Sequence, residues 1–205
     1  AEFGYIVDDT ETNQRFRWDL RMTVSDLIVE NYAGYFRELA AANGLKFSIE
    51  AYGAHPGHCP ANNLAYAGRA DMPMGEFWIG YNLRNCREMA SASHVYGKTI
   101  TAAEAFTAWP DNARWQYHPG NLKVYGDAAF CTGVNRLVLH CYTHQPWLDR
   151  APGMTMQGWG THFDRTETWW EQSKPWHEYI ARCQYLLQSG LFVADVCYLD
   201  VEDAP

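Results

Sequence analysis

Three glutamates stand at equivalent places in the chain, each near the end of a segment with the pattern of a β-strand: Glu50, Glu76 and Glu104. In a parallel sheet the carboxyl ends of the strands lie together at one edge, so carboxylates there can work as a pair. Cleavage of a glycosidic bond needs such a pair, because one protonated group assists the leaving oxygen and one ionised group activates water or attacks. A single glutamate in this place is more often a solvated strand end, but three at equivalent places favour catalysis.

The strongest predicted strand ends in a run of polar and aromatic residues, His140-Cys-Tyr142-Thr-His144-Gln-Pro-Trp147. Two histidines four residues apart can share a metal ion on a helix, but the strand period places these two differently. The simpler interpretation is that His140, Tyr142 and His144 make polar contacts with sugar hydroxyl groups. Trp147 then offers a flat surface on which a sugar ring can stack.

Tryptophans are frequent in the loops that follow the predicted strands, where an exposed ring could stack on a sugar face: Trp78, Trp109, Trp147 and Trp159. A second group flanks the start of a predicted helix and is expected to pack in the core or at its rim: Trp169, Trp170 and Trp176. We therefore expect the first group, and not the second, to contact a ligand.

A metal site is the competing interpretation of the histidines. The loop His55-Pro-Gly-His58-Cys59 places three metal-binding side chains together, but no fourth ligand is marked and zinc requires three or four. A loop shaped by its proline and glycine is the simpler explanation, so we predict no metal ligand there. The chain also contains no GxSxG elbow, Walker loop or GxGxxG motif, so serine hydrolysis and nucleotide binding lack their usual signatures.

Composition limits the class of protein and of partner. The chain has 205 residues, of which 47% are hydrophobic and 15% aromatic, with a formal charge of -8. This length suits one domain with a sizeable core. The acidic charge argues against nucleic acid and anionic membranes, and no apolar run approaches the roughly 20 residues of a membrane span. The six cysteines are scattered and form no CxxC pair, and those in apolar stretches are expected to be buried free thiols: Cys131, Cys141, Cys183 and Cys197.

Helical and strand periods alternate along the chain. The predicted helices span residues 24–39 (begun at Thr23 and ended by Asn43-Gly44), 82–93, 122–131 and 175–187. The predicted strands span residues 45–52, 71–78, 98–106, 136–142 and 192–198. Strands separated by helices indicate an α/β fold with a parallel sheet. A complete (β/α)8 barrel needs eight strands and about 250 residues, so we predict part of such a barrel, of about five strands, as a single domain over residues 1–205.

Several motifs together resemble a known family. They are Glu76-Phe-Trp, residues 90–98 (ASASHVYGK), residues 101–106 (TAAEAF), residues 133–140 (GVNRLVLH) and residues 158–165 (GWGTHFDR). These stretches resemble glycoside hydrolase family 106, a family of large bacterial α-L-rhamnosidases, and the likeness runs from about residue 19 to residue 198.

The resemblance implies a (β/α)8 catalytic barrel that removes terminal α-L-rhamnose, with inversion, from plant polysaccharides or glycosides. It further implies that Glu104 matches the general base and that calcium accompanies the site in some members, although the reaction itself requires no cofactor. The resemblance leaves two places open for the general acid, a strand upstream of Ala1 or a residue of this chain; within the chain, Glu76 is the first choice and Glu50 the second. Full-length members are expected in the periplasm or secreted, whereas Ala1-Glu2-Phe3 leads into polar sequence without a signal peptide.

Size is the departure from the family, whose members are many hundreds of residues long. A partial sheet would expose strand edges and apolar surface, so we expect the chain to self-associate. Two other functions stay open. One is an incomplete barrel that only binds carbohydrate, and the other is a metal-dependent hydrolase that uses His55, His58, His140 and His144.

Overall fold

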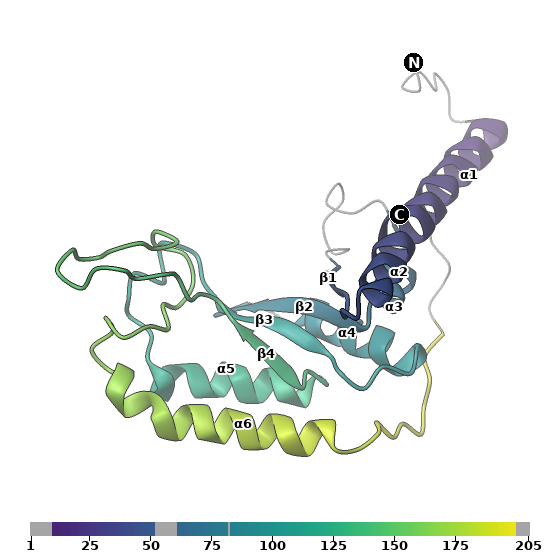
Figure 1. The fold of residues 1–205 in the computed structure, drawn as a ribbon. Helices are drawn as coiled ribbons and strands as arrows, with labels where there is room; N and C mark the ends of the chain where they lie inside the picture. Colours follow the sequence, from purple (N-terminus) through teal and green to yellow (C-terminus); the bar gives the residue numbers. More distant parts are fainter. Residues whose placement is uncertain (1–9, 52–60, 82, 200–205) are drawn as a thin grey trace.

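The computed structural model describes residues 10–51, 61–81 and 83–199. Its centre is a parallel sheet of four strands in the order β1-β2-β3-β4 (Figure 1). The strands are β1 (Ser48–Glu50), β2 (Met72–Trp78), β3 (Ala102–Thr107) and β4 (Arg136–Leu139). Sequential strands that pair in parallel, with helices between them, are the repeating unit of a (β/α) barrel, so the predicted fold class of a partial barrel is confirmed.

The helices are α1 (Glu11–Ile28), α2 (Tyr35–Ala42), α3 (Asn63–Arg69), α4 (Arg84–Val95), α5 (Pro119–Cys131) and α6 (Lys174–Gln188). A π-helical turn, η1 (Val29–Gly34), joins α1 to α2, and a 3-10 turn, η2 (Trp170–Ser173), leads into α6. Figure 1 shows α5 and α6 together along one face of the sheet, while α1 projects away from it. No helix in the described part of the chain is long and apolar enough to cross a membrane.

The first helix begins earlier than the sequence pattern predicts. Thr10, and not Thr23, is its N-cap, because the Thr10 side chain accepts a hydrogen bond from the Asn13 backbone N–H. The Thr23 hydroxyl instead donates to the Asp19 carbonyl inside the helix, at 2.7 Å. A threonine in mid-helix can satisfy its hydroxyl in this way, so the capping-box pattern at Thr23 was misleading. Helix α3 was not predicted at all.

The helices cover one face of the sheet and bury an aromatic core against it. Phe77 of β2 packs edge-on against Phe106 of β3, with ring centroids 5.0 Å apart. The Trp176 ring of α6 stacks on Phe163 at 5.8 Å. Trp169 and Trp170 pack partly buried against the same cluster, so the expectation of a packing role for this tryptophan group is confirmed.

Side chains of β2 alternate strictly between the two faces. Pro73, Gly75 and Phe77 are buried, whereas the residues between them are only half-buried. Gly75 allows α4 to approach, because a Cβ there would lie 2.6 Å from Asn85 Oδ1. The face without helices is therefore the one on which Glu76 stands, and it corresponds to the inside of a barrel.

The predicted fifth strand, over residues 192–198, does not form. This segment follows α6 as an extended tail and is largely exposed, with Tyr198 92% accessible. Its best contact is the stacking of Phe192 on His94, at 3.6 Å between ring centroids. An apolar, β-branched run needs an open strand edge to pair with, and the tail leaves α6 away from the edges of the sheet (Figure 1). The described sheet therefore has four strands and not five.

Candidate active site

The three predicted catalytic carboxylates share one face of the sheet. Glu76 and Glu104 are directly opposite each other in the parallel pairing of β2 with β3. Glu50 pairs with Met74, two residues before Glu76, and so lies on the same face one step nearer the amino ends. Because neighbouring strands are about 4.8 Å apart, Glu76 and Glu104 form an adjacent pair of carboxyl groups.

Two side chains contact the Glu104 carboxylate, one from β3 itself and one from just beyond β4. The Thr107 hydroxyl donates a hydrogen bond to Glu104 Oε1. His140 Nδ1, just beyond the end of β4, lies 3.8 Å from the same oxygen, close enough for an ion pair when the imidazole is protonated. Both partners contact Oε1. The carboxylate is half-buried and oriented, as a general base requires.

Thr107 was missed because a simple strand would turn it away from Glu104. The backbone at Phe106 has a φ of 65°, a left-handed conformation that is strained for a bulky residue. The pairing of β2 with β3 is irregular at this point, and Trp78 pairs with Thr107. This β-bulge directs the Phe106 ring into the core and returns Thr107 to the side of Glu104.

Glu76 is fixed from behind by Asn85 of α4. The Asn85 side chain accepts a hydrogen bond from the Glu76 backbone N–H at 2.8 Å and donates to the Ala51 carbonyl at 2.7 Å. One amide thereby joins the ends of β1 and β2. Sequence patterns gave no signal for Asn85, because its role depends on contacts across the sheet.

His140 is held by the segment that returns to the site after the long loop. The Thr161 N–H donates to the His140 carbonyl at 2.9 Å, and the Gly160 N–H donates to the Ala108 carbonyl at 2.9 Å. Gly160 has a φ of +68°, and a Cβ on it would lie 2.5 Å from His140 Nδ1. Only glycine allows this backbone to lie against the imidazole ring. The segment belongs to the GWGTHFDR motif, which entered the sequence argument only through the family likeness.

Three of the predicted tryptophans form a wall at the carboxyl ends of the strands. The ring centroids of Trp78 and Trp109 are 4.7 Å apart, and those of Trp109 and Trp159 are 4.9 Å apart. Trp109 is exposed, and the other two are half-buried. A partly exposed indole cluster beside two carboxylates is typical of a sugar-binding surface.

The remaining predicted contacts lie on the loop after β4 and are not brought into this wall. Tyr142 and His144 are exposed, and no contact joins either of them to Glu104 among the described residues. Trp147 lies farther along the same loop, 57% exposed. These three stay predictions as ligand contacts, whereas His140 is placed at the site.

Burial shifts the pKa of several groups around the site. It raises the pKa of Glu167 to about 7, and the Asp164 carboxylate adds to this shift. It also lowers the pKa of His162, with His140 acting in the same direction and Asp164 opposing. Burial, with a smaller contribution from Glu76, raises the pKa of Cys86 to about 12. The Cys86 thiol therefore stays protonated at neutral pH and is no nucleophile.

The prediction for the other cysteines holds only in part. Cys141 is buried, and this burial is the main cause that raises its pKa to about 11. Cys183 is half-buried, but Cys131 and Cys197 are exposed, contrary to the prediction. Cys131 ends α5 on its solvent side, and Cys197 lies on the exposed tail, so apolar neighbours in sequence did not bury either thiol.

The metal interpretation was tested on the donor groups. Within residues 10–51, 61–81 and 83–199, no three His, Cys, Asp or Glu side chains are grouped so that they could hold a metal ion. His55, His58 and Cys59 lie outside the described residues. The metal interpretation of His55 and His58 therefore stays a prediction.

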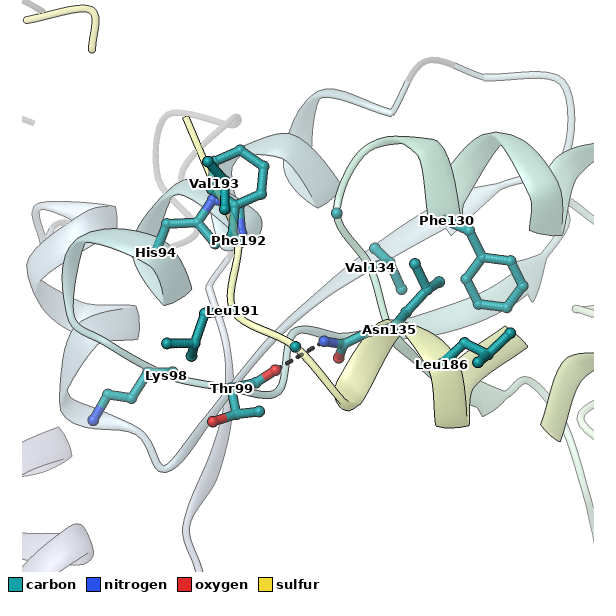
Figure 2. A pocket seen from close by; sticks show the side chains of 13 residues that line it. His94, Lys98, Thr99, Phe130, Val134, Asn135, Leu186, Leu191, Phe192 and Val193 are labelled. Carbon is teal, nitrogen blue, oxygen red and sulfur yellow. Dashed lines mark hydrogen bonds between the residues drawn. The ribbon is translucent and has the colours of Figure 1, made fainter. Parts of the chain in front are cut away.

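One cavity lies at the opposite end of the sheet. It measures about 430 Å³ and is bordered by α4, the end of α5 and the tail after α6. Figure 2 shows His94, Phe130 and Phe192 on its walls and the Asn135 amide bonded to the Thr99 carbonyl, at 2.8 Å. Among the described residues that line this cavity there is no carboxylate. In parallel α/β sheets chemistry belongs to the carboxyl ends of the strands, so this cavity is not the candidate active site.

Comparison with known proteins agrees with the geometry. The sequence pattern of the alpha-L-rhamnosidase family, glycoside hydrolase family 106, matches residues 1–205. A protein of Formosa agariphila, to which the name beta-glucuronidase has been assigned provisionally, is 42% identical over 204 residues, 98% of this chain and 17% of its own length. The structure of a rhamnosidase from Novosphingobium sp. PP1Y superposes with a TM-score of 0.85 at 38% identity, over 94% of this chain and 19% of that one. The chain therefore belongs to the α-L-rhamnosidase family and spans less than a fifth of these relatives.

Proposed function

From membership of the α-L-rhamnosidase family, we propose that this chain supplies the catalytic carboxylates of an inverting glycoside hydrolase that removes terminal α-L-rhamnose. Glu104 is the general base and Glu76 the general acid. The observation that carries the assignment is the register of β2 and β3, which sets the two glutamates opposite each other on the face without helices. The contacts of Glu104 with Thr107 and His140 support its role as the base.

In the proposed reaction, Glu104 Oε2 takes a proton from a water molecule as the water oxygen bonds to the anomeric carbon. Glu76 gives its proton to the glycosidic oxygen as that bond breaks, and both carboxyl groups then return to their starting states by exchange with solvent. Water attacks from the face opposite the leaving group, so the configuration at the anomeric carbon is inverted.

Inversion needs about 6.5–9.5 Å between the two carboxyl groups, against about 5–5.5 Å for retention. Strands about 4.8 Å apart would place two parallel side chains near the shorter value. The contact of Glu104 with His140, just beyond the end of β4, supports a carboxylate that leans toward β4, which is the side away from Glu76. This orientation supports room for a water molecule between base and sugar. The wall of Trp78, Trp109 and Trp159 supports stacking of the sugar ring.

Glu104→Gln tests the assignment with little change in side-chain volume. Loss of the general base should lower kcat on an aryl α-L-rhamnoside by about 10²–10⁴-fold with little change in KM. Glu178→Gln is the matched control, because Glu178 pairs with Arg182 on exposed α6. The first sugar product, followed by NMR, should be the β-anomer. A Glu104→Gln variant with full kcat would refute the base, and an α-anomer would refute inversion.

Glu76→Gln tests the acid separately. It should slow rhamnosides with poor leaving groups far more than activated aryl rhamnosides, because the latter need little help from a proton. If Glu76→Gln changed the rates for the two substrate types by the same factor, the general acid would be assigned instead to Glu50 or to a strand outside this chain.

A second candidate function is carbohydrate binding by an incomplete barrel. The tryptophan wall favours it, as does the coverage of less than a fifth of the relatives' length. Binding of rhamnosides without turnover, equal in the wild type and Glu104→Gln, would select this candidate.

We further propose that catalysis by Glu104 requires no cofactor. Each proton transfer of the proposed mechanism is carried by Glu104 or Glu76, and no step passes through a metal. Hydrolysis should therefore survive dialysis against EDTA. Activity that is lost on chelation and restored by calcium would refute this part of the proposal, and restoration by zinc alone would favour a metal-dependent hydrolase.

A further inference from the structure

A second hollow, of about 320 Å³, is built by the loop that follows β4. Figure 1 shows this loop extending beyond the sheet at the end where the strands finish, which is the end that carries the candidate active site. Its lining includes Gln145, Trp147, Arg150, Gly153 and Met154. The hollow thus lies on the side of the molecule from which a substrate would approach.

The loop is held in one shape by the buried amide of Gln145, which is only 3% exposed. Gln145 Nε2 donates to the Met154 carbonyl at 2.5 Å, and Gln145 Oε1 accepts from the Met154 N–H at 3.1 Å. Gly153 has a φ of +76°, and a Cβ on it would lie 2.1 Å from Gln145 Oε1. The Arg165 guanidinium donates to the Gln145 carbonyl at 2.5 Å and joins the loop to the segment that returns to the site. A shape fixed by such contacts is preorganised for a ligand.

The rim of the hollow carries an aromatic ring and a cation. Arg150 Cζ lies 5.1 Å from the centroid of the Trp147 ring, yet Trp147 stays 57% exposed. Within the part of the chain that the structure describes, the Arg150 guanidinium makes no hydrogen bond or ion pair. Its N–H groups are therefore available to an acceptor from outside the chain. The segment between β4 and η2 is not basic overall, with Arg150 and Arg165 against Asp149, Asp164 and Glu167, so the positive charge at the rim of the hollow is that of the Arg150 side chain itself.

We propose that this hollow is a subsite for a sugar residue that carries an anionic group, such as a uronate. The apolar face of the sugar lies on Trp147, and Arg150 binds the anion through two parallel N–H donors. A neutral sugar would not need this cation, whereas a guanidinium matches the planar geometry of a carboxylate. The inference rests on the proposed function only in assigning the subsite to the part of the substrate beyond the bond that is cleaved.

Binding to the purified chain tests the subsite without hydrolysis. The indole N–H signal of Trp147, assigned by its loss in Trp147→Phe, is followed by NMR during titration with D-galacturonate, galactose 6-sulfate and D-galactose. We expect at least one of the two anions to bind about tenfold or more tightly than galactose. The tighter of the two identifies the anionic group as carboxylate or sulfate.

Substitutions at Arg150 separate charge from geometry. Arg150→Gln should reduce binding of the anion to the level of galactose, and Arg150→Lys should restore only part of it, because lysine keeps the charge but lacks the planar donors. Arg182→Gln, on exposed α6, is the control and should bind as the wild type does.

Equal binding of galactose and both anions, a preference that survives Arg150→Gln, or no shift of the Trp147 signal up to about 100 mM sugar would each overturn the inference. Since the titration involves no turnover, its failure would leave the assignment of Glu104 intact. An inactive protein that still shows the preference would leave the subsite intact.

Discussion

Replacement of Gly160 by alanine should show whether the backbone behind His140 positions the catalytic base. Two costs are expected. Alanine at a φ of +68° is strained by about 1 kcal/mol relative to glycine. Its Cβ would also lie 2.5 Å from His140 Nδ1 and 2.8 Å from the His140 carbonyl oxygen, an overpacking that costs about 1–3 kcal/mol more.

Gly44→Ala is the matched control. Gly44 follows α2 with a φ of +69°, and a Cβ there would meet nothing within 4 Å. The control therefore has the backbone strain without the contact. For a chain of this size about 1 kcal/mol corresponds to about 2–4 °C in Tm, so Gly44→Ala should lose that much and Gly160→Ala about 5–15 °C.

The activity of the two variants completes the test. Because the relief of the contact pushes the imidazole from its place beside Glu104, kcat on an aryl α-L-rhamnoside should fall at least about tenfold in Gly160→Ala and hold in Gly44→Ala. Thermal unfolding followed by circular dichroism gives Tm, and the assay is run well below both midpoints. Equal losses of Tm would refute the packing argument, and full kcat in Gly160→Ala would refute the role of His140.

Three further predictions concern the base, the acidic loop and the open sheet. Thr107→Val removes the hydroxyl that bonds Glu104, so kcat should fall about tenfold with KM kept; Thr132→Val, which removes a hydroxyl bond to a helix carbonyl, should leave kcat unchanged. Burial raises the pKa of Glu167 to about 7, so the stability that its protonated form provides is complete below about pH 4.5 and is lost as pH rises through about 7. After allowance for solvent screening, the free energy lost at high pH is about 1 kcal/mol. Glu167→Gln should therefore raise Tm by about 2–4 °C at pH 8 and leave Tm unchanged at pH 4. An equal gain in Tm at both pH values would contradict the reasoning. The open sheet should make the chain self-associate at low micromolar concentration, and a mass of 23.5 kDa by light scattering would show that it does not.

The sequence predicted the four strands because each is a short apolar run followed by a turn or loop, but it predicted some of them too long. Residues 98–101 lie outside β3, where the Asn135 side chain bonds the Thr99 carbonyl and the Thr101 N–H in place of a paired strand. The run at 192–198 has the same local pattern as a true strand, yet no neighbour pairs with it. Strand formation depends on a partner distant in sequence, and local patterns cannot supply that information.

The same distinction between local pattern and distant partner applies to the candidate site. The common face of Glu50, Glu76 and Glu104 could be predicted, because each stands near a strand end and alternate residues of a strand point to opposite faces of the sheet. The supporting contacts could not, because Asn85 reaches across from α4 and Gly160 returns from a loop many residues later.

The backbone conformation of Phe106 explains why the sequence did not indicate Thr107 as a hydrogen-bond partner of Glu104. By the period of two, Thr107 should face the helices, opposite to Glu104, and only the left-handed backbone at Phe106 reverses this. That conformation persists because the ring is fully buried against Phe77 and because the Phe106 carbonyl accepts the Thr161 hydroxyl at 3.3 Å. The same core contacts that stabilise the fold therefore maintain the strain that turns Thr107 toward Glu104. Glycine at this position would relieve the backbone but remove the ring, so stability and the orientation of the base cannot be improved independently here.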